Sequence, residues 1–108
     1  EEYVSIPSIF VDNSSGKHFI LKVVGDSMID AGIDSGDLVI IREEINAKAG
    51  DIVAALVDGT GSTLKRLKSD DKGLFLWAEN EAWDNKKRFY GRNFQIQGVA
   101  VKAVKNLT

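Results

Sequence analysis

The 108-residue chain is 44% hydrophobic, which suits one compact domain with a single core. Its 14 basic and 16 acidic residues give a net charge of −2, so it lacks the basic excess of a nonspecific DNA-binding surface. The absence of cysteine and the single histidine exclude disulfides, cysteine-protease chemistry and thiolate or multi-histidine metal sites. We therefore expect no metal, no other cofactor and no direct contact with DNA.

The apolar runs at Phe19–Val24, Leu38–Ile41 and Ile52–Val57 are far shorter than the ~20 residues that span a bilayer. The acidic start Glu1-Glu2 lacks the cationic and apolar regions of a secretory signal. The sequence therefore predicts no membrane association and a cytoplasmic location.

The predicted elements begin with an N-terminal arm over residues 1–18, which contains the sole proline and a polar loop at 12–17. The domain itself is predicted over residues 19–108, as short runs rich in β-branched residues that alternate with turns. Strands are predicted at Phe19–Val24, Asp37–Arg42, Ile52–Val57, Ser62–Lys68, Gly73–Ala78 and Phe94–Val104. The expected fold is mostly β, with compact, strongly twisted and largely antiparallel sheets and at most short helical turns.

Two segments depart from this strand pattern. Ser27 followed by Asp30 imitates a capping box, and Gly32 is placed to end a single helical turn over Ser27–Ala31. In the last strand, the polar face becomes apolar at Gly98, which predicts a bend there and cover on both faces beyond it.

Ser27 is the candidate nucleophile, because a turn after the strand that ends near Val24 would expose its hydroxyl beside unpaired backbone amides. Such amides stabilise an oxyanion. The competing interpretation is a serine that only caps the helical turn, and residue type alone favours that interpretation.

Lys65 is the candidate base, since a serine hydroxyl needs one and a neutral lysine amine can serve. Lowering a lysine pKa from ~10.4 to about 7.5 costs roughly 4 kcal/mol, which requires apolar enclosure and no nearby carboxylate. We therefore expect Asp26 to point away from the amine, and Thr63, two residues earlier on the same strand face, to hold it. A solvated strand lysine is the alternative.

Other combinations are weaker. A triad of Ser27, His18 and an aspartate has no spacing that recommends it. Asp34, Asp37 and Asp51 lie in Gly-Asp turn settings without calcium-loop spacing.

The basic and aromatic residues of 86–92 form either a small nucleic-acid patch or, as the acidic composition favours, a solvated turn. Trp77 and Trp83 are most simply core or interface aromatics.

Taken together, these segments resemble the self-cleaving domain shared by LexA, phage CI-type repressors and the polymerase subunit UmuD. The resemblance covers about residues 4–106. It is carried by VGDSMIDAGIDSGDLV at 24–39, GDIVAA at 50–55, TLKRL at 63–67, Glu79-Asn80, and IQGVA at 96–100. It implies the twisted β fold of the LexA C-terminal autoprotease.

The resemblance also implies roles. Ser27 would be the nucleophile, Lys65 the general base and Thr63 the residue that holds the lysine. The backbone amides of Ser27 and Met28 would form the oxyanion hole. Members of the family cut their own chain, typically at an Ala-Gly or Cys-Gly bond N-terminal to this fold.

The chain's own Ala31-Gly32 and Ala49-Gly50 bonds fall inside segments that match the folded scaffold, so neither is a credible cleavage site. We therefore expect the cleaved segment to precede Glu1, with residues 1–18 as the remnant of the linker. The chain would be either the cleavage product or a form shortened to this domain. Two departures from the family pattern are Ala78, where proline is usual, and a slightly longer turn at 58–62.

The resemblance leads to a functional expectation: the self-cleavage and dimerisation domain of a LexA- or CI-like repressor of the DNA-damage response or of a prophage. It implies a homodimer, a RecA–DNA filament as co-protease, the chain's own linker as substrate, and DNA binding by a separate N-terminal domain. The alternatives are a processed UmuD-like subunit of a translesion polymerase and a β binding module whose serine and lysine are structural.

Overall fold

A computed structural model describes residues 2–4, 16–57, 61–84 and 88–107. Its strands are β1 (Glu2–Val4), β2 (His18–Lys22), β3 (Leu38–Glu43), β4 (Ile52–Val57), β5 (Gly61–Asp70), β6 (Gly73–Trp77), β7 (Phe89–Tyr90) and β8 (Phe94–Val104). Two 3-10 turns, η3 (Ile29–Ala31) and η4 (Gly91–Asn93), lie between them. The predicted mostly β fold is confirmed.

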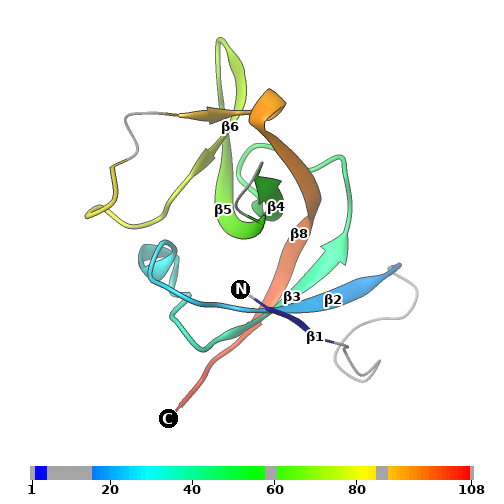
Figure 1. Cartoon of the computed structure of the whole chain (residues 1–108), viewed down its shortest axis with the longest axis vertical. Coiled ribbons are helices and arrows are strands. Elements are labelled where there is room, and N and C mark those ends of the chain that lie inside the picture. Colours follow the sequence, from blue (N-terminus) through cyan, green and yellow to red (C-terminus); the bar gives the residue numbers. More distant parts are fainter. Residues whose placement is uncertain (1, 5–15, 58–60, 85–87, 108) are drawn as a thin grey trace.

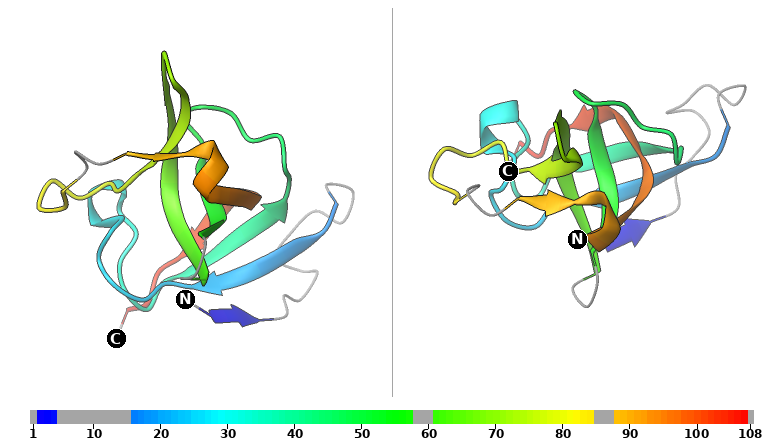
Figure 2. Two further views of the ribbon diagram at one scale, coloured as in Figure 1. Left: turned by 45° about the horizontal axis from the view of Figure 1, so that its top comes forward. Right: turned by 90° about the horizontal axis from the view of Figure 1, so that it is seen from above.

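Within the described residues the strands form one sheet in the order β1-β2-β3-β8-β4-β5-β6-β7. Every neighbouring pair is antiparallel, as expected. The sheet twists strongly, so that β2 runs across β5 (Figures 1 and 2). This twist brings the loop that follows β2 beneath β5 and the loop that follows β6.

The predicted strands match the observed ones to within two residues at most ends, and β4 and β8 match at both ends. The sequence did not predict β1 and β7, which have three and two residues. Runs this short show no alternation, and each exists as an edge strand paired with one longer neighbour.

Two apolar clusters fill the interior. The larger cluster joins Met28, Val23 and Ile33 of the loop between β2 and β3 to side chains of strands β2 to β5: Leu21, Val39, Ile41, Ala54 and Leu64. The smaller cluster lies around β4, β5 and β6: Val53, Ala55, Leu67 and Leu76. Alternate residues of β4 and β5 thus belong to different clusters, so both faces of these two strands are covered.

β8 crosses the sheet between β3 and β4, and the register shifts along it against both partners. The irregularity expected at Gly98 is present, and a Cβ there would lie 2.4 Å from the carbonyl oxygen of Arg42. The expected cover beyond Gly98 is wrong: residues 101–104 are exposed. The physical reason is that pairing with β4 ends at Val99, so the remainder of β8 lies beside β3 alone.

None of the helices in the described ranges has the length and apolarity needed to cross a membrane. Most of the predicted loop at 12–17, and Lys86 and Lys87 of the proposed basic patch, lie outside the described residues. The boundary at residue 18 stays a prediction, although β2 begins at His18.

Candidate active site

Ser27 lies in a loop that leaves the sheet after β2 and returns to it at β3. Two backbone hydrogen bonds close the base of this loop: Val23 N donates to Asp37 O at 2.9 Å, and Gly36 N donates to Val23 O at 2.8 Å. Gly25 has φ of 100°, a left-handed conformation that glycine adopts without strain. The chain can therefore turn sharply two residues before the serine.

Met28 anchors the turn, because its side chain is 1% exposed and belongs to the larger apolar cluster. It is also the N-cap of η3, which ends at Gly32 in the left-handed conformation. The predicted helical turn ending at Gly32 is confirmed, but the capping role of Ser27 is wrong, since η3 has no side-chain cap hydrogen bond. The serine falls one position too early, which leaves its hydroxyl for other partners.

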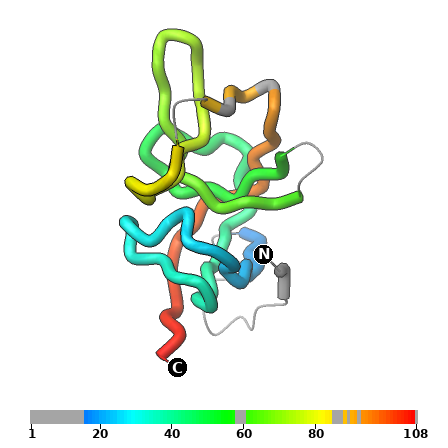
Figure 3. The backbone as a smooth tube through the Cα atoms, turned by 60° about the vertical axis from the view of Figure 1, so that its left-hand side comes forward, coloured from blue at the N-terminus to red at the C-terminus, as the bar shows by residue number. Residues whose placement is uncertain are grey.

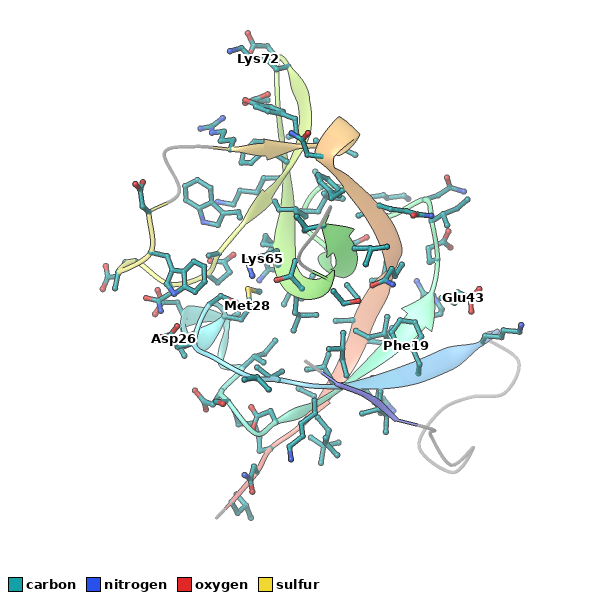
Figure 4. The ribbon with its side chains drawn as sticks, in the orientation of Figure 1. Phe19, Asp26, Met28, Glu43, Lys65 and Lys72 are labelled. Carbon is teal, nitrogen blue, oxygen red and sulfur yellow. The ribbon has the colours of Figure 1, made fainter. Side chains whose placement is uncertain are left out.

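Lys65 reaches that hydroxyl from the middle of β5. Its Nζ donates to Ser27 Oγ at 3.1 Å, to Thr63 Oγ1 at 2.6 Å and to Leu64 O at 3.2 Å. Figure 4 shows Lys65 directed toward the turn that carries Met28. The side chain is partly buried, so the solvated strand lysine is not what the structure shows.

The strand register explains the position of Lys65. Lys65 pairs with Val53 of β4 and Thr63 pairs with Ala55, so all four side chains share one face of the sheet. Val53 and Ala55 are fully buried. The aliphatic part of Lys65 therefore lies beside these apolar side chains, while its amine reaches Ser27.

The acidic side chains of the surrounding loops have other partners. Trp83 Nε1 donates to Asp26 Oδ1 at 3.0 Å, and Arg66 Nε pairs with Glu79 Oε1 at 2.9 Å. The Asp26 carboxylate is thus held by the Trp83 indole, and its expected orientation away from Lys65 stays a prediction. The Trp83 ring also covers the amine, with Lys65 Nζ 5.3 Å from the ring centroid. Trp83 is 44% exposed, so of its two predicted roles it does not have the core one, and the interface role stays a prediction.

The segment that follows β6 holds the serine loop from the opposite side. Figure 3 shows this yellow segment above the cyan loop that contains Ser27. Asp30 N donates to Glu79 O at 2.7 Å, and Glu81 N donates to Asp30 Oδ2 at 2.8 Å. Asn80 Nδ2 donates to Asp26 O at 2.8 Å. The two loops are therefore joined by hydrogen bonds on both sides of Ser27.

The backbone amides of Ser27 and Met28 lie next to the hydroxyl along the chain. Within the described part of the chain, neither the N–H of Ser27 nor that of Met28 donates to a protein acceptor. Two adjacent unpaired amides next to a serine hydroxyl have the composition that an oxyanion hole requires.

Asp37 fixes the far end of the serine loop. Its carboxylate is 1% exposed, pairs with Lys105 and accepts the backbone N–H groups of Asp34 at 2.8 Å and Asn106 at 2.9 Å. Burial alone would raise the pKa of this carboxyl, but the hydrogen bonds from Lys105, Asn106 and Asp34 lower it to about 2. Lys105 thus ties the C-terminal end of the chain to the loop that carries Ser27.

The remaining candidates do not converge on the site. His18 Nδ1 donates to Gly16 O at 2.9 Å in a local turn. Asp51 accepts a backbone N–H within its own turn, and Asp34 and Asp37 share Lys105, which agrees with their turn settings.

Sequence reasoning missed three contributors: Asn80, Trp83 and Lys105. The resemblance marked Asn80 without giving it a role. Lys105 gave no signal, because its partners lie about seventy residues earlier.

Comparisons with known proteins identify relatives of this chain. The model of the family described as Peptidase S24-like matches residues 1–101. A LexA repressor from Ruegeria sp. (strain TM1040) is 42% identical to the chain over 103 residues. That match covers 95% of the chain and 42% of the relative's length.

Proposed function

Because the chain belongs to the Peptidase S24-like family, we propose that it is the self-cleaving domain of a LexA-like repressor, with Ser27 as nucleophile and Lys65 as general base. The observation that carries the proposal is the 3.1 Å contact between Lys65 Nζ and Ser27 Oγ. A β module with a merely structural serine and lysine gives no reason for this contact between residues 38 positions apart.

The partners of Lys65 indicate how the amine would act. A neutral amine keeps two N–H donors and one lone pair. Leu64 O can only accept, and Thr63 Oγ1 can accept the second N–H, so the lone pair is directed at Ser27. Lys65 would then take the Ser27 proton as the hydroxyl attacks the scissile carbonyl, and return it to the leaving amine.

The two adjacent amides of Ser27 and Met28 would bind the oxyanion of the tetrahedral intermediate. Their positions are fixed before substrate binds, because Met28 is buried and the loop is closed at its base. Fixed donors of this kind stabilise the developing charge without reorganisation. Water would then hydrolyse the acyl-enzyme.

The substrate in this proposal is a peptide bond of the chain's own upstream linker, of the Ala-Gly or Cys-Gly type. The domain would form a homodimer and would respond to a RecA–DNA filament in the cytoplasm of a bacterium. Operator binding would belong to a separate domain, in accord with the net charge of −2 of this chain. The printed name of the relative, a LexA repressor, and its 42% identity support this assignment.

Cleavage in trans tests the proposal. A peptide that spans the linker upstream of Glu1 is incubated with the chain at alkaline pH, and its products are identified by mass spectrometry. We expect cleavage by the wild type and by Lys68→Ala, whose lysine lies on β5 but over Trp77 at 4.2 Å. Ser27→Ala and Lys65→Ala should cleave at background rate, and equal rates for all four proteins would refute the proposal.

A further inference from the structure

Asn80 is a buried polar side chain that the proposed reaction does not use. It lies in the loop after β6 and is 5% exposed. Its Nδ2 donates to Asp26 O at 2.8 Å, and its Oδ1 accepts the N–H of Ala82 at 3.0 Å. Both ends of the amide are therefore occupied, one within its own loop and one on the loop that carries the nucleophile.

The oxygen that Asn80 contacts belongs to the peptide group that joins Asp26 to Ser27. The N–H of this planar group is the Ser27 amide, so its direction is fixed by the same plane as Asp26 O. A hydrogen bond to the oxygen of a peptide group also polarises its N–H and strengthens that N–H as a donor. Asn80 can therefore orient and strengthen the Ser27 amide without touching substrate.

We propose that Asn80 is a positioning residue of the oxyanion hole, acting on the Ser27 amide through Asp26 O. The inference rests on the proposed function, because it assumes that Ser27 is the nucleophile. It gives the loop after β6 a part in transition-state stabilisation, in addition to its packing against the loop that carries Ser27.

The surrounding contacts separate this role from a general structural one. Asp30 and the backbone of Glu79 and Glu81 join the two loops by two further hydrogen bonds, of 2.7 and 2.8 Å. These bonds do not involve the Asn80 side chain. Its removal should therefore leave the loops joined and Lys65 in place, while Asp26 O loses the 2.8 Å bond from Asn80 and keeps the longer 3.4 Å bond from Ile29 N.

The test uses a small alkyl fluorophosphonate and the whole 108-residue chain. The Ser27 oxygen forms a bond to phosphorus, the phosphorus–fluorine bond breaks, fluoride leaves and Lys65 takes the hydroxyl proton. The phosphoryl oxygen occupies the oxyanion hole. The rate of labelling is followed by intact mass at a series of pH values. The midpoint of the rate against pH reports the pKa of the base, and the plateau at high pH reports the rate of attack by Ser27.

For Asn80→Ala we expect the plateau to fall about 10- to 100-fold, less than or equal to the loss of a direct oxyanion donor. The midpoint should move by less than about 0.3 pH unit, because the base is untouched. The control is Tyr90→Phe, which removes the 2.7 Å bond from Tyr90 to Asp70 far from Ser27 and should label within about twofold of wild type.

Asn80→Ser is the second variant, since its neutral hydroxyl oxygen can accept Ala82 N in the same turn but the side chain is too short to donate to Asp26 O. It should show the same lower plateau. An unchanged plateau in both variants, or a shifted midpoint, would overturn the role of Asn80 while leaving the proposed function intact. Equal labelling of Ser27→Ala and wild type would instead refute the proposed function.

A measurement on the wild type covers the case in which neither variant folds. On addition of phenylboronic acid, the Ser27 amide proton and the Asn80 side-chain amide protons should shift together in NMR spectra, because polarisation through the peptide is reciprocal. A Ser27 shift without any Asn80 shift would overturn the proposal.

Discussion

The buried carboxylate of Asp37 provides a stability prediction whose size follows from the structure. Its pKa is lowered from 3.8 to about 2 by hydrogen bonds that outweigh the effect of burial. A shift of nearly two units corresponds to about 2 kcal/mol of folding free energy. Because the folded-state pKa lies below the unfolded one, this stabilisation is complete above about pH 4 and is lost as pH falls toward 2.

Asp37→Asn tests this reasoning, since the amide has nearly the same shape but no charge. In one orientation its N–H₂ group faces Lys105 and Asp34 N, and in the other it faces Asn106 N, all of which are donors. We expect the variant to be less stable by about 2–3 kcal/mol at pH 7, because the neutral amide loses the charged hydrogen bonds of the carboxylate. The loss is no larger because Lys105 is 44% exposed and regains water when its partner is neutral.

Urea denaturation at several pH values between 7 and 2.5 measures the difference in free energy of unfolding between the wild type and Asp37→Asn. The difference should be constant near neutral pH and should narrow below about pH 4, as the wild-type carboxylate loses its advantage. Comparing two proteins at each pH cancels the titration of the other carboxylates. A difference that is independent of pH, or smaller than about 0.5 kcal/mol at pH 7, would refute the assignment.

Two further substitutions test the site and the sheet. Thr63→Val removes the 2.6 Å bond to Lys65 with little change of shape. Fluorophosphonate labelling of Ser27 should therefore slow by about three- to tenfold, while the stability changes little. An unchanged labelling rate would contradict the role of Thr63. Gly98→Ala places a Cβ 2.4 Å from Arg42 O, so urea denaturation should show a free energy of unfolding lower by about 1–3 kcal/mol. A variant as stable as the wild type would show that β8 does not approach β3 as closely as described.

Most strands were predictable because short runs of β-branched residues, separated by turns that contain Gly and Asp, favour strands over helices. Ile52–Val57 is such a run, and it forms β4 with the predicted bounds. The exposure of residues 101–104 was not predictable from alternation, because it depends on where β4 begins rather than on the composition of β8.

The contacts of the site show which features local sequence patterns do not predict. Alternation along β5 left it open whether Lys65 or Arg66 points toward the serine, and the structure pairs Arg66 with Glu79 instead. Thr63 on the same strand face favoured Lys65, and the family resemblance then selected it. Asn80 and Lys105 contact the serine loop across 54 and 71 positions of sequence, a separation at which no local periodicity carries information.

The claim that a lysine-activated serine forms the reactive centre is tested most directly by locating the fluorophosphonate adduct and its dependence on Lys65. Tryptic mass spectrometry should place the adduct on Ser27 alone, with a labelling rate that rises with pH until the amine is neutral. Lys65→Arg keeps a cation that does not deprotonate, so labelling should slow at least about 100-fold. Labelling of Lys65→Arg at the wild-type rate, or an adduct on another residue, would contradict the account.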